Sequence, residues 1–317
     1  MTTLRTLRFH EYGEPASVLR LDRIDVPSPP AGRIRAVVHA CGLNPADWAL
    51  CRGLFPGILP RGIGLEVSGI VDALGEGVTD VAKGDRVVGT ADFAGGTSAG
   101  ASDRAIMDHW AKVPAGLDLV QVAAVPTVSM TAFGGLEALR VTAGQVVLIH
   151  GAGTMVGFAA VQLALGRGAR VIATAGETYA GRLRARGAQV TSYGEGMVER
   201  VREIAGGPVE LALDTGPVSG VLPDLVRIVG GDPRHVFTLV DFAAAAQLGA
   251  RHPFGEGENA KMPYDVLGEL IQRAAEGKLT IPIARTFALE DWREALDLSQ
   301  SGHARGKLVL LPGGAAS

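Results

Sequence analysis

The first third of the chain contains short hydrophobic stretches whose spacing predicts β-strands. Within residues 33–40, Ile34, Ala36, Val38 and Ala40 recur at a period of two residues, as in a strand with one buried face. Residues 64–78 (GLEVSGIVDALGEGV) and 83–89 (KGDRVVG) have strand character interrupted by glycines that suit bends. Closely spaced strands with this punctuation predict a barrel-like or strongly bent sheet.

From about Pro126 to Phe254 the pattern changes to apolar strands that alternate with helices. Predicted strands cover 146–149, 170–173, 188–191, 210–214 and 235–240, and predicted helices lie at 156–167, around 182–186, at 197–205 and at 221–229. Glycine pairs at 206–207 and 230–231 end the last two helices. Repeated strand–helix units imply a parallel sheet with helices on both sides. Beyond them, amphipathic helices are expected at 266–275 and around 289–296, followed by a strand at 307–311.

The strongest functional signal lies in residues 146–174, a strand, a glycine loop, an apolar helix and a second strand. Gly151, Gly153 and Gly157 let the backbone turn sharply and keep side chains away from a ligand over the loop. The helix from about Val156 then directs its free N–H groups and positive dipole end at that ligand. A tight turn that packs a helix on a sheet needs the same glycines, and Thr154 and Met155 depart from the commonest fingerprint. The flanking strands favour the nucleotide site of a doubly wound α/β domain.

Composition limits the class of protein. The 317 residues exceed one typical domain, and 47% hydrophobic with 20% charged residues suits a globular chain. A net charge of −3 gives no reason to expect nucleic acid or an anionic membrane as partner. The N-terminus lacks a signal-peptide core, and no later stretch is long and apolar enough to span a bilayer. Cys41 and Cys51 fit reduced cytosolic thiols better than a disulfide. We therefore expect a soluble, cytoplasmic protein.

Six motifs together resemble the medium-chain dehydrogenase/reductase superfamily, and within it the zinc-free quinone oxidoreductase branch. They are GLNPADW (42–48), GLEVSGIV (64–71), VAKGDRVVG (81–89), AAVPTVSMTAFGGL (123–136), the glycine loop and GHARGKLVLLP (302–312). The resemblance implies an α/β protein with a GroES-like β-rich catalytic domain over residues 1–125, completed by residues 261–317. A Rossmann NAD(P)-binding domain with a doubly wound parallel sheet would occupy residues 126–260. The resemblance also implies a homodimer, formed through the edge of the Rossmann sheet.

The alcohol dehydrogenases of this superfamily hold a catalytic zinc ion through a cysteine and a histidine on the first two motifs. The matching positions here are Asn44 and Leu65. A carboxamide and an alkyl chain cannot replace thiolate and imidazole as zinc ligands. The four-cysteine structural zinc lobe is also missing, because no cysteine follows Cys51. We therefore predict no zinc, and hydride transfer from NAD(P)H to a quinone or α,β-unsaturated carbonyl, which forms no alkoxide directly.

The resemblance assigns catalytic roles to Asn44, as a polar residue near the nicotinamide, and to Thr131, as a contact of the nicotinamide end. From the residues alone, Asn44 is equally a turn-former before Pro45, and Thr131 a helix-packing residue. Asp47 is expected to cap the helix beginning at Pro45 rather than act as an acid or base. Related enoyl-thioester reductases carry a tyrosine, their presumed proton donor, where this chain has Phe55. Tyr12 is the nearest alternative in the sequence, and water or another group remains open.

The predicted cofactor contacts follow the glycine loop and the ends of the neighbouring strands. They are Gly151, Gly153, Thr154, Met155, Val156, Gly157, Thr174, Gly176, Tyr193 and Val240. Tyr193 matches a tyrosine that lines the adenosine side of the family's cofactor. The second strand ends in Thr174-Ala175-Gly176, without the acidic residue usual for NAD, which favours NADPH over NADH. Arg182 and Arg184 supply positive charge nearby, whereas Glu177 favours NADH.

Two alternatives stay open beside the reductase hypothesis. The first is an NADPH-binding redox sensor or structural protein with little turnover, because few ordinary catalytic side chains were identified. The second is a zinc alcohol dehydrogenase, which one bound zinc ion per chain would indicate.

Overall fold

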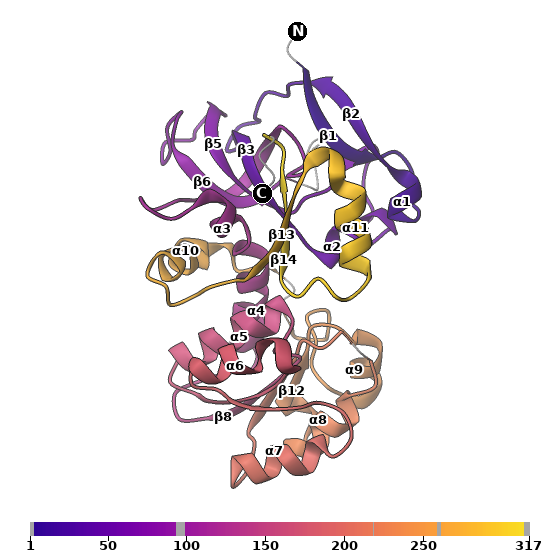
Figure 1. Cartoon of the computed structure of the whole chain (residues 1–317), viewed down its shortest axis with the longest axis vertical. Helices are drawn as coiled ribbons and strands as arrows, with labels where there is room; N and C mark the ends of the chain where they lie inside the picture. Colours follow the sequence, from indigo (N-terminus) through magenta and orange to yellow (C-terminus); the bar gives the residue numbers. More distant parts are fainter. Residues whose placement is uncertain (1–2, 93–98, 218, 259–260, 314–317) are drawn as a thin grey trace. The chain divides into compact units, whose positions relative to one another are not determined.

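A computed structural model describes residues 3–92, 99–217, 219–258 and 261–313 of the chain (Figure 1). It divides into two compact units. Unit 1 comprises Met1–Thr127 and Tyr264–Ser317, and unit 2 comprises Val128–Pro263. The chain therefore leaves unit 1 once, builds unit 2 as an insertion, and returns to complete unit 1.

Unit 1 is built mainly from strands. Its strands are β1 (Thr3–Phe9), β2 (Leu19–Asp25), β3 (Ile34–Leu43), β4 (Arg61–Gly62), β5 (Glu66–Leu74), β6 (Arg86–Ala91), β7 (Arg104–Lys112), β13 (Ile283–Ala288) and β14 (Lys307–Leu311). Its helices are α1 (Pro15–Val18), α2 (Pro45–Cys51), α3 (Leu119–Ala123), α10 (Leu267–Ala275) and α11 (Trp292–Gln300), with 3₁₀ turns at Tyr264–Val266 and Leu289–Asp291. The sequence pattern did not predict β1, β2, β4, β7, β13, α1 or α3.

The larger sheet of unit 1 closes on itself. Its strand order is β13-β14-β3-β5-β6-β7, and β7 pairs back onto β3. Strand β3 pairs with β5 along most of its length, with register shifts between Arg35 and Ala36 and between Val38 and Ala40. It also pairs with both β7 and β14, because β7 uses residues 34–37 and β14 uses residues 41–43. The predicted barrel-like sheet is confirmed, and the alternation in β3 buries Ile34, Ala36, Val38 and Ala40 while leaving Val37 partly exposed.

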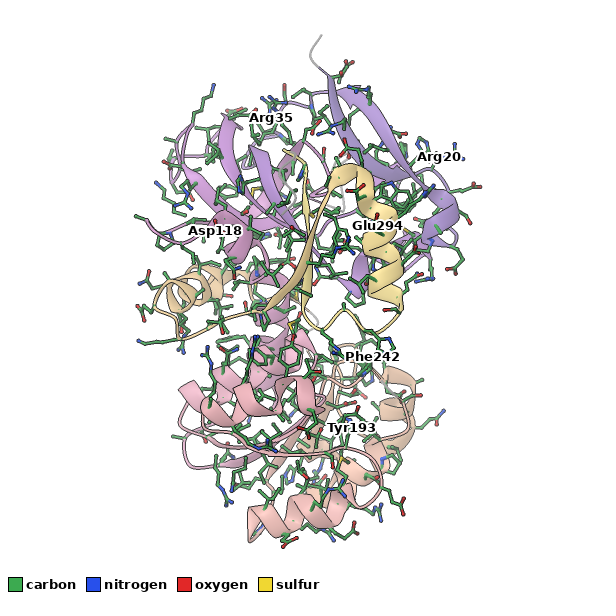
Figure 2. The ribbon with its side chains drawn as sticks, viewed as in Figure 1. Arg20, Arg35, Asp118, Tyr193, Phe242 and Glu294 are labelled. Carbon is green, nitrogen blue, oxygen red and sulfur yellow. The ribbon has the colours of Figure 1, made fainter. Side chains whose placement is uncertain are left out.

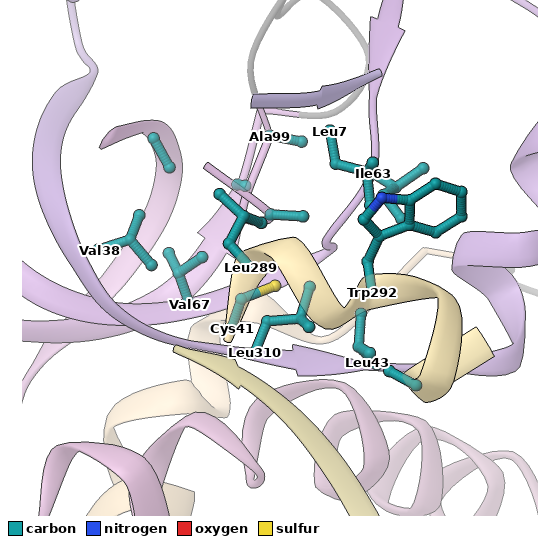
Figure 3. Close-up of a cluster of buried hydrophobic side chains, with 14 of the residues drawn as sticks. Leu7, Val38, Cys41, Leu43, Ile63, Val67, Ala99, Leu289, Trp292 and Leu310 are labelled. Carbon is teal, nitrogen blue, oxygen red and sulfur yellow. The ribbon is translucent and has the colours of Figure 1, made fainter. Parts of the chain in front are cut away.

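The core of unit 1 joins both ends of the sequence. Figure 3 shows Trp292 and Leu289 near α11 beside Leu43 and Cys41 of β3 and Leu310 of β14. All five side chains are buried in one hydrophobic cluster. The described residues after Tyr264 therefore share one hydrophobic core with the N-terminal part of unit 1.

Unit 2 alternates strands and helices. Its strands are β8 (Val146–His150), β9 (Arg170–Thr174), β10 (Gln189–Thr191), β11 (Leu211–Asp214) and β12 (Val236–Thr238). Its helices are α5 (Met155–Gly166), α6 (Glu177–Ala185), α7 (Met197–Ala205), α8 (Leu222–Ile228) and α9 (Phe242–Leu248), with a 3₁₀ turn at Pro233–His235. Helix α4 (Pro126–Ala138) begins just before the first residue of unit 2 and continues into it.

All five strands of unit 2 run parallel, in the order β10-β9-β8-β11-β12. Leu148 of β8 and Ile172 of β9 lie in one buried cluster with residues of α7 and α8. Because side chains alternate along a strand, Val147 and Ile149 belong to the opposite face. The predicted doubly wound sheet is confirmed. In the described ranges no helix has the length and apolarity needed to cross a membrane.

Candidate functional site

The glycine loop of unit 2 turns directly from β8 into α5, and two of its glycines are required by close backbone contacts. Gly151 has φ +74°, and a Cβ there would lie 2.5 Å from Gly216 Cα. A Cβ on Gly157 would lie 2.4 Å from the carbonyl oxygen of Gly151 and 2.5 Å from Thr215 Oγ1. Both positions exclude larger residues, because Gly151 packs against the backbone of Thr215 and Gly216, and Gly157 at the start of α5 packs against Gly151.

The third glycine faces open space. The nearest heavy atom to a Cβ on Gly153 would be Tyr179 Cδ2, at 4.0 Å. Thr154 is the N-cap of α5, and its Oγ1 accepts the N–H of Gly157 at 3.0 Å. The N–H groups of Met155 and Val156 have no hydrogen-bond partner among the described residues. Free N–H groups at the positive end of a twelve-residue helix, beside an unobstructed glycine, fit a phosphate group.

Buried polar side chains support the loop from the ends of the neighbouring strands. Thr174 Oγ1 accepts the N–H of Gly151 at 3.1 Å and lies 2.9 Å from Nδ1 of His150. Thr215 Oγ1 donates to the carbonyl oxygen of His150 at 2.7 Å. Burial lowers the pKa of His150 to about 4, so its imidazole is neutral at pH 7. Thr174, which stays a predicted cofactor contact, is fully buried and supports the loop by accepting the N–H of Gly151.

Asp214, at the end of β11, is the acidic group of this buried set. Its Oδ1 accepts the N–H of Gly216 at 3.0 Å, and its Oδ2 accepts the hydroxyl of Thr238 at 2.8 Å. Burial raises the pKa of Asp214 to about 6, more than these two hydrogen bonds lower it. Asp214 thereby joins the ends of β11 and β12 beside the glycine loop.

Two further predicted contacts lie together near the end of β9. Gly176 is the N-cap of α6, and a Cβ on it would lie 3.9 Å from Tyr193 Oη. Tyr193 is 60% exposed, so its ring is open to a ligand (Figure 2). The guanidinium of Arg200 holds the loop that carries this tyrosine, donating to the carbonyl oxygens of Ser192 and Glu195 at 3.1 and 2.7 Å.

The remaining charged groups near β9 have different surroundings. Arg184 donates to the carbonyl oxygen of Val190 at 3.3 Å, and the guanidinium of Arg182 lies 6.0 Å from the Tyr179 ring centre. Glu177 is exposed in the first turn of α6. Val240, beyond β12, is 41% exposed, and its N–H donates to Thr238 Oγ1.

Asn44 belongs to unit 1, where its carboxamide is enclosed in a polar network. It is the N-cap residue of α2 and is 5% exposed. Its Oδ1 accepts from Lys307 Nζ at 2.5 Å, and its Nδ2 donates to Glu66 Oε1 at 3.0 Å. Lys307 and Glu66 also form an ion pair, and Glu66 Oε2 accepts the N–H of Thr127 at 2.7 Å. Sequence reasoning did not single out Lys307 or Glu66, although each is a charge beside an apolar strand.

Asp47 has the capping role expected of it. Its Oδ2 accepts the N–H of Asn44 at 2.7 Å, while its Oδ1 accepts the N–H groups of Gly64 and Leu65 at 2.7 and 3.1 Å. Burial raises the pKa of Asp47 to about 6 against the opposing effect of these bonds. The side chain therefore ties the start of α2 to the segment that leads into β5.

The residues at the family's zinc positions do not fit zinc. Leu65 has no ligand atom, and the carboxamide oxygen of Asn44 already accepts from a lysine ammonium group. Cys41 and Cys51 are both buried, and burial raises the pKa of each thiol, to about 12 for Cys51, which disfavours the thiolate form that binds metals. No group of three metal-binding His, Cys, Asp or Glu side chains occurs within the described ranges.

The last predicted residues are Thr131 and the two aromatic residues considered for proton donation. Thr131 is on α4 in unit 2, whereas Asn44 is in unit 1. Phe55 is 51% exposed in the segment after α2. The hydroxyl of Tyr12 donates to the carbonyl oxygen of Gly57 at 2.9 Å and accepts its N–H at 2.7 Å. Tyr12 therefore anchors the backbone of that segment.

Comparison with known proteins identifies the family. Residues 30–117 match the family model described as alcohol dehydrogenase GroES-like domain, and residues 186–310 match the one described as zinc-binding dehydrogenase. The solved quinone oxidoreductase from Coxiella burnetii superposes with a TM-score of 0.80 at 28% identity, covering 98% of this chain and 99% of that one. The chain belongs to the medium-chain dehydrogenase/reductase superfamily. The predicted family and fold class are thereby confirmed.

Curated members of the superfamily are similar over parts of their length. Quinone oxidoreductase from Sus scrofa is 37% identical over 176 residues, which cover 55% of this chain and 53% of that protein. Erythronolide synthase EryA2 from Saccharopolyspora erythraea is 35% identical over 298 residues, covering 88% of this chain and 8% of the synthase. The chain thus spans about half the length of the curated quinone oxidoreductases that it matches.

Proposed function

We propose that the protein is an oxidoreductase that binds NADPH on the glycine loop of unit 2 and reduces a quinone or an α,β-unsaturated carbonyl without zinc. The observation that carries this proposal is the open face of the loop, where Gly153 is unobstructed and the N–H groups of Met155 and Val156 have no partner in the part of the chain that the structure describes. The similarity to quinone oxidoreductases from Sus scrofa and Coxiella burnetii supports the same activity.

Bound NADPH would supply the hydride, and the protein would supply position and polarity. In this proposal, Asn44 donates a hydrogen bond to the oxygen on which negative charge develops, and Thr131 contacts the nicotinamide end of the cofactor. Phe55 has no proton to give, and the Tyr12 hydroxyl is engaged with Gly57. We therefore expect the proton to come from solvent.

Zinc independence is supported by the residues at the family's two zinc-ligand positions, Asn44 and Leu65, which do not offer suitable ligand atoms. A catalytic zinc ion would need Asn44 to exchange its lysine partner for the metal and Leu65 to be replaced. Without a Lewis acid, a simple alkoxide has little stabilisation, whereas a quinone or enone spreads the incoming charge over its own π system. This chemistry favours an electron-poor acceptor.

The preference for NADPH rests on the absence of an acidic side chain among Thr174, Ala175 and Gly176. The exposed Tyr193 beside Gly176 offers an aromatic surface to the adenosine end. We therefore expect NADPH to bind more tightly than NADH. Exposed Glu177 opposes a 2′-phosphate, so we expect NADH to remain usable.

The test is steady-state oxidation of NADPH and NADH with a panel of small quinones and enones, alongside metal analysis of the same sample. We expect turnover that depends on the acceptor, a higher kcat/KM with NADPH, and less than one zinc ion per ten chains. Tight NADPH binding without acceptor-dependent oxidation would instead favour the sensor or structural role. One zinc ion per chain would favour an alcohol dehydrogenase.

The homodimer and the cytoplasmic location are part of this proposal. The outer side of β12 is already hydrogen-bonded to Arg251, whose N–H donates to Val236 and whose carbonyl oxygen accepts from Thr238. A partner through this sheet edge would therefore pair outside Arg251. Light scattering tests the dimer, and imaging of a tagged chain tests the location.

A further inference from the structure

The sheet of unit 1 brings three polar side chains from distant parts of the sequence to one buried position. In the pairing of β14 with β3, Leu308 lies opposite Leu43, so Lys307 and Asn44 follow at the next position. In the pairing of β3 with β5, Gly42 lies opposite Glu66. Side-chain exposure is 3% for Lys307 and 0% for Glu66. The backbone register therefore fixes the meeting of these groups.

Hydrogen-bond chemistry gives the Asn44 amide one favourable orientation. A lysine ammonium group only donates, and an ionised carboxylate only accepts. Asn44 Oδ1 faces Lys307, and Nδ2 faces Glu66, which matches both requirements. Turning the amide by 180° would set its NH₂ group against the ammonium and its oxygen against the carboxylate. The ion pair thus disfavours one of the two orientations that an isolated asparagine adopts.

This orientation leaves one hydrogen of Nδ2 uncommitted. Glu66 uses one of the two N–H bonds, and Nδ2 makes no second hydrogen bond to the described residues. We propose that Lys307 and Glu66 are positioning residues that hold the Asn44 carboxamide so that this N–H faces the oxygen of the acceptor. The inference rests on the proposed function, because that function is what gives Asn44 its substrate.

The composition of the network supports a positioning role over a purely stabilising one. A buried ion pair contributes little net stability compared with apolar side chains of similar volume. Its benefit lies in specifying one arrangement, and here that arrangement ends on a predicted catalytic amide. Gly42 maintains it, because a Cβ on Gly42 would lie 2.7 Å from Glu66 Oε1 and 2.5 Å from the carbonyl oxygen of Ala123.

The first test reads the amide itself and needs no turnover. The chain has only two asparagines, Asn44 and Asn259, so selective ¹⁵N-asparagine labelling gives two side-chain NH₂ signals. The Asn259→Asp variant assigns them. We expect the two Asn44 protons to differ strongly in chemical shift and to exchange slowly with solvent.

The variant Lys307→Met leaves Glu66 unpaired and risks misfolding, so Lys307→Met/Glu66→Gln is the main variant, because it removes both charges. In the double variant, we expect the chemical shifts of the two Asn44 side-chain protons to become more similar and both protons to exchange faster with solvent. Lys278→Met, which breaks the exposed pair with Glu276, is the matched control and leaves them unchanged. If the Asn44 signals of the folded double variant are the same as those of the wild type, the inference is wrong.

The second test is a kinetic cycle with NADPH and a small quinone. In the Asn44 background, Lys307→Met/Glu66→Gln is expected to lower kcat on the order of ten-fold, with the dissociation constant of NADPH little changed. In the Asn44→Ala background, the same double substitution is expected to change kcat by less than about two-fold. An equal loss in both backgrounds would mean that the pair does not act through Asn44.

The two tests separate failure of this inference from failure of the proposed function. If no acceptor supports NADPH oxidation, the proposed function fails, while the labelling experiment still reports whether the pair orients the amide. If turnover occurs and neither the signals nor kcat depend on the pair, the positioning role alone is wrong.

Discussion

The carboxylate of Asp47 accepts the backbone N–H of Gly64 at 2.7 Å. It also accepts the N–H groups of Leu65 and Asn44, and it is fully buried. Three backbone donors from two segments therefore depend on one side chain, with no water available to replace it. The two positions that would bind zinc in related enzymes are joined in this chain by a carboxylate.

We predict that Asp47→Ala destabilises the protein by about 3 kcal/mol or more, since it leaves buried N–H groups unpaired. Asp118→Ala is the matched control, because Asp118 caps α3 by accepting the N–H of Gln121 at 2.9 Å in exposed surroundings. That variant is expected to lose about 1 kcal/mol. Urea unfolding at pH 7 measures both, and equal losses would contradict the structural role of Asp47.

A second prediction concerns Tyr12, whose hydroxyl donates to the carbonyl oxygen of Gly57 and accepts the N–H of the same residue. Tyr12→Phe should cost about 1 kcal/mol and speed proteolytic cleavage of residues 53–60, because the hydroxyl only anchors backbone. The kcat for quinone reduction should stay within about two-fold of wild type. If Tyr12 were instead the proton donor, kcat would fall by roughly 10²-fold or more. Limited proteolysis and steady-state kinetics on one preparation separate the two roles.

Local sequence patterns were sufficient for the βα repeat, the glycine loop and the alternation in β3. Each depends on residues within a few positions of one another, such as Gly151 and Gly157 around the start of α5. The network around Asn44 depends on Lys307, 263 residues away, and no local pattern encodes that register. A sign was nevertheless present, because Glu66 and Lys307 are opposite charges at the starts of apolar strands, where an unpaired charge is costly.

The same distinction applies to the buried polar side chains that support the glycine loop. The loop was predicted from its glycines, but His150 and Thr174 meet only when β8 and β9 pair in parallel. The contact of Thr174 with the cofactor stays a prediction, and its hydrogen bond to Gly151 was not predicted. The end of strand β9 was predictable, but the partners of its last side chain were not, because they come from the end of β8 and the loop that follows it.

A third prediction follows from the pKa of His150, which burial lowers from 6.5 to about 4. Below about pH 6.5 the imidazole of His150 binds a proton in the unfolded chain but not in the folded protein. The free energy of unfolding therefore decreases as pH falls from 6.5 toward 4. Between pH 7.5 and pH 5 the loss is about 2 kcal/mol. We expect His150→Gln to remove that dependence, so the wild-type advantage over the variant shrinks by this amount.

Urea unfolding at the two pH values measures the difference between wild type and His150→Gln. The difference is the useful quantity, because Asp214, whose pKa is raised to about 6, titrates in the same range with the opposite effect. Its protonated form is favoured in the fold, so its contribution is lost as pH rises toward 6. A difference that is independent of pH would show that folding does not lower the pKa of His150.

The last prediction separates cofactor binding from folding within the glycine loop. A methyl group on Gly157 meets the Gly151 carbonyl oxygen at 2.4 Å, whereas one on Gly153 has its nearest heavy atom at 4.0 Å. Gly157→Ala should therefore destabilise unit 2 by about 1–3 kcal/mol. Gly153→Ala should fold normally but weaken NADPH binding at least ten-fold, since its methyl group occupies the face where the pyrophosphate approaches the backbone.

Gly181→Ala is the matched control for both variants. Gly181 is an exposed residue inside α6, and a Cβ there has no heavy atom within 4 Å. This substitution should stabilise the protein by about 0.5–1 kcal/mol and leave NADPH binding unchanged, because alanine is the better helix former. Thermal unfolding and NADPH fluorescence titration measure all three variants. If Gly153→Ala binds NADPH as tightly as Gly181→Ala does, the open face of the loop is not where the cofactor's phosphates lie.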